Sequence, residues 1–284
     1  MIQIGDIQIA VVSDGVVHVD AGGPFGLVPR ALYHSRFEPD ANNLIPMTLN
    51  CLLVRVAGKT VVVDTGLGDK LTDKLKRQWM LERPAGGLLD ALARHGVRPA
   101  DVDLVINTHL HGDHCAGDTA FNSDLSGVVP VFPNAEYVTQ RREYSDAMQP
   151  NERTQATYIP VNYQPLVESG QMHLLDGDAE ILPGVYGVIT PGHTPAHMSI
   201  RFESQGQHAL YVADLASYAV HFERLGWMTA YDVEPLQTLE TKRYWQQWAL
   251  DSGALILFEH DPYVCAGHVV QDGDRRRIEP VNVS

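Results

Sequence analysis

A dense group of imidazole and carboxylate side chains lies between Thr108 and His114. Within this segment, His109, His111, Asp113 and His114 bring three imidazoles and one carboxylate into six consecutive positions. Chance does not readily produce such a spacing. Neutral imidazole and carboxylate are good ligands for Zn, and also for Fe or Mn, so the segment predicts a metal site. We expect His109 and His111 to face one ion and Asp113 and His114 to face a second.

The segment resembles the His-x-His-x-Asp-His signature of the metallo-β-lactamase superfamily, and further ligands of that family are matched in the required order. His193, in TPGHTP after an expected strand, matches the third histidine of the first metal site. Asp214, in YVAD, matches the carboxylate that bridges the two ions. His260, in FEHDP, matches the last ligand of the second site, and Asp64, in DTG, matches an early aspartate that supports the ligands. These motifs extend from about residue 50 to residue 262.

The resemblance implies that the chain binds two divalent metal ions. The expected ligands are His109, His111, Asp113, His114, His193, Asp214 and His260. Zn is the expected metal, with Mn, Fe or Co as alternatives. The other histidines are expected to be ordinary surface or core residues: His18, His34, His95, His173, His197, His208, His221 and His268. Of these eight residues, His197 is the nearest in sequence to an expected ligand, because it lies only four positions beyond His193.

The ligand set also indicates a reaction. A carboxylate shared by two ions, here Asp214, favours a filled dinuclear site, and two close ions lower the pKa of the water between them toward neutrality. We therefore expect a bridging hydroxide to attack a carbonyl carbon or phosphorus, while one ion polarises the substrate oxygen and the other stabilises the leaving alkoxide. Asp113 is expected to be either a proton shuttle or a ligand only.

Within the superfamily, the chain resembles the N-acyl homoserine lactonase-like branch. The likeness rests on Asp214, on the HDP sequence that begins at His260, and on a long N-terminal segment that contains GLVP. The expected activity is thus the opening of a lactone ring. Some lactonases carry a catalytic tyrosine three residues after the bridging aspartate. Here that position is Ser217 and Tyr218 follows it, so Tyr218 is either a catalytic residue or an ordinary core or surface tyrosine.

Other functions are compatible with the same ligands. Phosphotriesterases or arylesterases of this fold share both the metal ligands and the long N-terminal segment. A redox or sensor protein of this fold would use the same residues to hold iron, and a comparison of bound metal with hydrolytic turnover would identify it. A thioesterase for an acidic substrate is disfavoured, because the sequence has no basic cluster to bind it.

Short apolar runs supply the strands that must position the ligands. Residues 2–13 are rich in Ile and Val, residues 51–56 and 60–64 are typical of a hairpin, and the strand expected at 102–106 ends just before the metal segment. Further strands are expected at 136–139, 185–190, 197–202, 209–213 and 255–258, and helices at 88–95, 141–148 and 235–251. The mixed order predicts a layered α/β sandwich, and the resemblance implies an αββα arrangement. Apolar strands that end in Asp64 and Asp214 are consistent with two similar sheet units that face one another.

The chain length of 284 residues and the 44% hydrophobic content are typical of one globular domain, expected over 1–284. Residues 20–50 are rich in Gly, Pro and Asn and show no sustained period, which predicts a long loop. We expect Phe25 and Leu27 in that loop to supply apolar side chains to a substrate pocket or a subunit interface. The alternative is that they cover the core of the domain itself.

The formal net charge of -14 would repel a polyanion, so nucleic acid is an unexpected partner. The N-terminal residues have no signal-peptide pattern, and no apolar run approaches about 20 residues, which predicts a cytoplasmic protein without a membrane partner. The expected partners are a small ester or lactone substrate and a second copy of the chain in a homodimer. Cys51, Cys115 and Cys265 are expected to be small buried residues outside any disulfide framework. The alternative for Cys115, which directly follows an expected ligand, is a reactive thiol or a further ligand.

Overall fold

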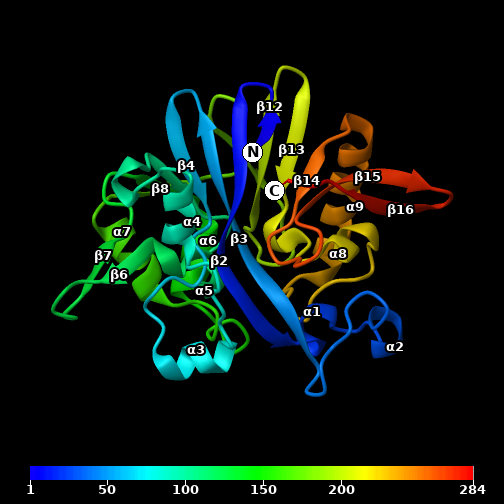
Figure 1. Cartoon of the computed structure of the whole chain (residues 1–284), viewed down its shortest axis with the longest axis horizontal. Coiled ribbons are helices and arrows are strands. Elements are labelled where there is room, and N and C mark those ends of the chain that lie inside the picture. Colours follow the sequence, from blue (N-terminus) through cyan, green and yellow to red (C-terminus); the bar gives the residue numbers. More distant parts are fainter. Residues whose placement is uncertain (284) are drawn as a thin grey trace.

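Two seven-stranded β-sheets packed face to face form the centre of the computed structural model, which describes residues 1–283 (Figure 1). The first sheet consists, in spatial order, of β1 (Ile2–Ile4), β2 (Ile7–Asp20), β3 (Leu44–Val56), β4 (Lys59–Val63), β5 (Leu104–Ile106), β8 (Glu136–Gln140) and β9 (Met172–Leu175). The second consists of β10 (Ala179–Leu182), β11 (Val185–Ile189), β12 (Met198–Ser204), β13 (Gln207–Tyr211), β14 (Leu255–Leu257), β15 (Ala266–Asp272) and β16 (Arg275–Pro280). A separate hairpin joins β6 (Thr119–Phe121) and β7 (Val128–Pro130).

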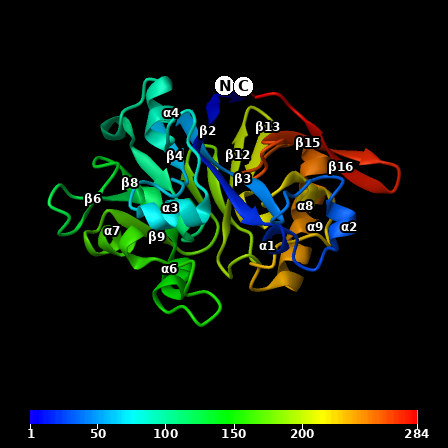
Figure 2. The ribbon, with the colours of Figure 1, turned by 60° about the horizontal axis from the view of Figure 1, so that its bottom comes forward.

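The outer faces of both sheets are covered by helices, which confirms the predicted αββα sandwich. The helices are α1 (Gly22–Phe25), α2 (Arg30–Tyr33), α3 (Asp73–Trp79), α4 (Leu88–Arg94), α5 (Gly112–Cys115), α6 (Arg141–Met148), α7 (Gln164–Glu168), α8 (Ala219–Glu223) and α9 (Pro235–Ser252). Four short 3-10 turns are η1 (Pro99–Asp101), η2 (Ala116–Asp118), η3 (Pro160–Asn162) and η4 (Ala213–Leu215). Figure 2 shows α4 and α7 on one side of the two sheets and α9 on the other. Within residues 1–283, no helix combines the length and the apolar character needed to cross a bilayer.

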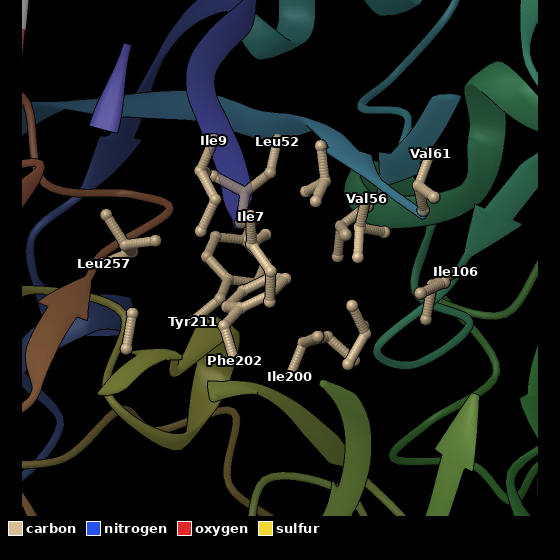
Figure 3. Packing of buried hydrophobic residues seen from close by; sticks show 14 of the residues in the cluster. Ile7, Ile9, Leu52, Val56, Val61, Ile106, Ile200, Phe202, Tyr211 and Leu257 are labelled. Atoms are coloured by element: carbon tan, nitrogen blue, oxygen red, sulfur yellow. The ribbon is translucent and has the colours of Figure 1, made fainter. Parts of the chain in front are cut away.

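The strands alternate between the two faces of each sheet, so successive residues enter different cores. On β3, Leu52 and Val54 face the second sheet, whereas Leu53 packs toward α4. On β13, Tyr211 lies between the sheets and Leu210 packs under α9. Figure 3 shows the inter-sheet cluster, in which side chains of both sheets interdigitate. The sheets are thereby fixed face to face, and this packing sets the distance between the loops that follow their strands.

The directions of the strands bring their carboxyl ends to one edge of the sandwich. In the first sheet β4, β5 and β8 are parallel. In the second, β13 and β14 are parallel, and β11 runs the same way because both β11 and β13 are antiparallel to β12. Ligands of open α/β sheets bind outside the carboxyl ends of such strands. The segments that follow four of these strands, β5, β11, β13 and β14, carry all seven residues of the expected metal site.

The segment 20–50 is more ordered than the predicted loop. It contains α1 and α2, and its last residues belong to β3, which begins at Leu44. Phe25 has no solvent exposure and stacks on Tyr33 at 4.3 Å between ring centroids, whereas Leu27 is fully exposed. The prediction that these two side chains line the substrate pocket is therefore wrong, and the core alternative holds for Phe25. Helices of four residues are too short to give a periodic pattern, which is why the sequence indicated only a loop.

We expect Phe25→Ala to destabilise the protein by about 3–5 kcal/mol, because it removes a ring from a closed aromatic cluster. For the expected lactone substrates the Michaelis constant should not depend on acyl length, since Phe25 does not line the cavity over the expected ligands. Chemical denaturation and kinetics with substrates of two chain lengths measure both quantities. Leu27→Ala is the control and should change stability by less than about 0.5 kcal/mol. A chain-length effect at unchanged stability would restore the pocket interpretation.

Candidate metal centre

The seven predicted ligands come together at the shared edge of the two sheets. The motif that begins at His109 follows β5, and its second half forms α5. His193 lies in the loop after β11, and His260 follows β14. Asp214 follows β13 in the turn η4, where Ala213 has a left-handed φ of 43°. Such a conformation is costly for a residue with a Cβ, and it recurs at functional sites.

The first cluster consists of three imidazoles and one carboxylate whose ligand atoms lie within 4.8 Å of one another. His111 Nδ1 is 3.1 Å from His109 Nε2 and 3.1 Å from His193 Nε2. Asp214 Oδ2 lies 3.1 Å from His193 Nε2 and 3.9 Å from His109 Nε2. These four atoms surround one common point, as the ligands of a single ion would.

The second cluster shares Asp214 with the first. His114 Nε2 and His260 Nε2 are 3.3 Å apart, and Asp113 Oδ2 lies 3.9 Å from each of them. The other oxygen of Asp214, Oδ1, is 3.2 Å from His260 Nε2. Oδ2 of Asp214, besides its contacts in the first cluster, lies 3.5 Å from His114 Nε2. The carboxylate of Asp214 thus lies between the two clusters, as a bridging ligand must.

The donor atoms fit a transition-metal ion in spacing and in chemistry. Four ligands at tetrahedral Zn–N distances lie about 3.3 Å from one another, close to the separations within each cluster. Burial, reinforced by the neighbouring imidazoles, lowers the pKa of His109 and His111 well below the usual value. Both rings are therefore held in the neutral form in which imidazole binds a metal. For His114, His193 and His260 burial is outweighed by the neighbouring carboxylates, which raise the pKa of these three rings. The site matches a metal centre better than a hydrogen-bonded network of buried histidines.

Residues outside the clusters fix the orientation of the ligand rings. Asp64 accepts hydrogen bonds from the amide and the hydroxyl of Thr108, both at 2.8 Å, and lies 3.2 Å from His114 Nδ1. Asp232 Oδ1 is 3.0 Å from His193 Nδ1, and His260 Nδ1 lies 2.7 Å from the carbonyl oxygen of Thr48. Partners of this kind hold the tautomer that leaves the other ring nitrogen free for a metal. The family pattern indicated Asp64, but no sequence signal marked Asp232, which comes close only through tertiary structure.

Glu143, like Asp232, is a buried carboxylate that the sequence did not indicate. It lies at the end of the site near His111. It accepts hydrogen bonds from the Leu110 amide at 3.0 Å, from Tyr158 at 3.0 Å and from the Thr194 hydroxyl at 2.6 Å. Glu143 therefore ties the loop after β5 to the loop after β11. This link holds together the histidines that the two sheets contribute.

His197 lies beside the ligands but is occupied by other partners. The backbone amide of Asp214 donates to His197 Nε2 at 3.2 Å, and His197 Nδ1 lies 2.8 Å from the Thr190 hydroxyl. Burial, with the neighbouring His193, lowers the pKa of His197 to about 3, so the ring is neutral. His197 thus positions Asp214 through its backbone, in agreement with its exclusion from the predicted ligands.

Cys115 is also outside the ligand set, since its thiol donates to the carbonyl oxygen of Leu110 at 3.4 Å. Like Cys51 it is buried, and Cys265 is partly buried. All three are free thiols, as predicted. Burial raises the pKa of the Cys115 thiol well above its usual value.

A cavity opens over the two clusters. Its polar side includes His111, Asp113, His193, Asp214, Ser217, Thr157, Thr229 and His260, and its other lining residues are Val19, Pro24, Met47, Trp79, Tyr218 and Tyr231. The Ser217 hydroxyl donates to Asp214 Oδ1 at 2.7 Å, whereas the Tyr218 hydroxyl donates to the carbonyl of Pro46 at 3.3 Å. Tyr218 therefore faces the cavity with its hydroxyl engaged by the backbone. The apolar wall comes from Val19, Pro24, Met47 and Trp79 instead of Phe25 and Leu27.

Comparisons with known proteins agree with this site. The family model of the metallo-beta-lactamase superfamily matches residues 45–268. An N-acyl homoserine lactonase from Bacillus cereus is 26% identical over 246 residues, which cover 83% of this chain and 89% of the relative. The structure of a probable metal-dependent hydrolase from Staphylococcus aureus has a TM-score of 0.88 at 29% identity, over 99% of this chain and 100% of that one. AidC, a dizinc quorum-quenching lactonase, shares the fold with a TM-score of 0.81 at 19% identity, over 99% of this chain and 96% of its own.

Since the family model covers most of its length, the chain belongs to the metallo-beta-lactamase superfamily. Its His/Asp clusters are those of a metal-binding member of the family. Family, site and relatives together identify the protein as a metallo-hydrolase.

Proposed function

We propose that this protein is a dinuclear metal-dependent hydrolase that opens lactone rings of the N-acyl homoserine lactone type. The observation that carries the proposal is the position of Asp214 between the clusters, with Oδ2 near His193 and His114 and Oδ1 near His260. The lactonase named among the relatives supports a cyclic ester as the substrate. Two divalent ions held by these ligands would supply an activated water nucleophile and a Lewis acid for the ester carbonyl.

The side chains of the protein have separate roles in this proposal. Asp214 spans the two clusters and fixes the distance between them. Asp113 is partly exposed to the cavity and can carry a proton to the oxygen that leaves the opened ring. Ser217 holds Asp214 in place through its hydroxyl. Tyr218 forms part of the wall against which the substrate lies, because its hydroxyl already has a backbone acceptor.

The cavity lining also supports a neutral substrate with an apolar chain. None of the described lining residues is Lys or Arg, so the cavity offers no cationic side chain to bind an anionic group away from the metal ligands. Val19, Pro24, Met47 and Trp79 form one apolar side, next to the ligands. A substrate with its lactone ring over the two clusters would place its acyl chain along this apolar side of the cavity.

Trp79→Ala should raise the Michaelis constant for N-decanoyl homoserine lactone about tenfold and change that for the N-butanoyl substrate little. The reason is that only the longer chain reaches the indole, and each buried methylene contributes about 0.8 kcal/mol. Steady-state kinetics with both substrates measure the difference. Leu75→Ala is the matched control, since Leu75 lies on the same helix α3, is exposed and does not line the cavity. An equal loss for both chain lengths would exclude Trp79 from the acyl site.

A substrate panel tests the proposed activity directly. Metal-loaded protein should hydrolyse N-acyl homoserine lactones with kcat/KM at least about 100-fold above that for aryl esters and phosphotriesters. Faster turnover of phosphotriesters would instead identify the second candidate function predicted from the sequence. Bound iron without hydrolysis of any of these substrates would identify the redox or sensor alternative.

Three further properties remain predictions from the sequence. They are the identity of both metals as Zn, the cytoplasmic location and the assembly into a homodimer. The residues 1–284 are proposed to fold as one domain. Metal analysis of natively purified protein and its sedimentation behaviour would test the first and the third.

A further inference from the structure

A buried glutamate next to the last metal ligand has no role in the site described so far. Glu259 follows β14, immediately precedes His260 and has no exposed surface. Its backbone carbonyl accepts hydrogen bonds from the Thr48 hydroxyl at 2.8 Å and from the Asn50 amide at 3.2 Å. The main chain is thus fixed to β3 of the opposite sheet. The side chain is not among the residues that line the cavity over the clusters.

The nearest nitrogen to this carboxylate belongs to a metal ligand. Glu259 Oε2 lies 3.0 Å from Nδ1 of His114, the ring nitrogen that points away from the second cluster. The Tyr211 hydroxyl is also near, but it donates to the carbonyl of Asn50 at 2.7 Å. Within residues 1–283, His114 is therefore the closest side chain able to compensate this buried carboxylate.

Asp64 approaches the same nitrogen, at 3.2 Å, but it is already engaged. Its two oxygens accept the amide and the hydroxyl of Thr108. His114 Nδ1 can donate only one proton, and its contact with Asp64 has hydrogen-bond geometry. Glu259 Oε2 lies 3.0 Å from the same nitrogen without accepting a hydrogen bond, so its contact with the ring is electrostatic. A buried carboxylate that lacks a partner costs several kcal/mol, so the imidazole is needed to keep Glu259 in this position.

From this geometry we propose that Glu259 is a positioning residue that holds the ring of His114 with Nε2 facing the second metal cluster. The inference rests on the proposed dinuclear function and adds a residue to it. Glu259 Oε2 and Asp64 Oδ2 both lie within 3.2 Å of this ring nitrogen, which favours the orientation that turns Nε2 toward the second cluster. In the first cluster, the residue that corresponds to Glu259 is Asp232, whose carboxylate lies 3.0 Å from Nδ1 of His193. Loss of such a partner lowers metal affinity about 10–100-fold.

The test compares three variants of Glu259 by metal binding. Glu259→Met removes the acceptor at similar volume, Glu259→Asp keeps the charge but withdraws the oxygens by one methylene, and Glu259→Gln keeps an acceptor oxygen within reach. In competition with a chelator, the Met and Asp variants should bind the second ion about 10–100-fold more weakly and the first ion normally. The Gln variant should remain close to wild type. The visible spectrum of the Co²⁺-loaded protein should change in the Met and Asp variants, because the ring that holds the second ion is displaced.

Asp118→Asn is the matched control. Asp118 is also a fully buried carboxylate, but it accepts hydrogen bonds from Thr65 and Asn107 and contacts no predicted ligand. This variant can lower the melting temperature and should leave both metal affinities unchanged. If the Met and Asp variants of Glu259 also bind both ions as wild type does, Glu259 only packs and the proposal is overturned. A wild-type chain that binds no second ion would overturn the dinuclear function itself, and the role of Glu259 with it.

Discussion

The Asp214→Ala variant should lose at least about a thousandfold in lactone turnover, while its melting temperature without metal shifts by only a few degrees. The substitution removes the carboxylate that faces both clusters, and the five histidines of the site remain. Single ions could still bind, but their separation would no longer be fixed. The rate and the melting temperature are measured on the same preparation.

Two further variants show whether the loss of turnover results from the loss of the bridging carboxylate. Asp214→Asn keeps one oxygen donor, so it should retain more metal than the alanine variant and still lose most of the activity. Asp118→Asn should keep its activity, because that buried carboxylate lies outside the clusters. An Asp214→Ala enzyme with most of its activity would contradict the bridging role.

Removal of the metal ions should lower the melting temperature by about 10 °C and abolish activity. Four carboxylates, those of Asp64, Asp113, Asp214 and Glu259, lie around the second cluster with little solvent. Without cations their mutual repulsion is balanced only by the neighbouring imidazoles. A ligand present at about a thousand times its Kd stabilises the fold by about 4 kcal/mol, and each kcal/mol shifts the melting temperature by about 2–4 °C in a domain of this size.

The reversal of this effect distinguishes metal binding from general damage by the chelator. Addition of Zn²⁺ to the chelated protein should restore both the melting temperature and the turnover. Mg²⁺ should restore neither, because it prefers oxygen ligands and the clusters are mainly imidazole. Equal melting temperatures with and without bound metal would show that the clusters contribute nothing to stability.

The metal ligands could be predicted from the sequence because they match the ligand pattern of the family that it resembles, and because each motif follows an apolar strand. The run from Leu104 to Ile106 identifies β5, and the motif at His109 follows it directly. His193, Asp214 and His260 follow β11, β13 and β14 in the same way. Strand ends of one direction meet at one edge of a sheet, so the strand order together with the motifs was enough to bring the ligands together.

The supporting residues could not be predicted in this way, because their partners are distant in the sequence. Asp232 reaches His193 across a loop, and Glu143 reaches Thr194 from α6. Their isolated carboxylates resemble surface residues until the fold buries them. Glu259 was visible beside His260, but only the structure shows that its side chain points to His114.

The wall of the cavity was misassigned for a related reason. The composition of residues 20–50 indicated apolar side chains in need of a partner, which is correct for Phe25. It could not show which face of a four-residue helix turns inward. In α1 the neighbouring Pro24 lines the cavity and Phe25 enters the aromatic core, so adjacent residues have different roles.

Titration of metal-free protein with Zn²⁺, with lactone ring opening followed at each addition, tests the dinuclear lactonase function most directly. Activity should stay low through the first equivalent, rise with the second and remain constant beyond two ions per chain. A plateau at one equivalent would contradict the bridging role of Asp214. Two tightly bound ions without ring opening would contradict the proposed substrate.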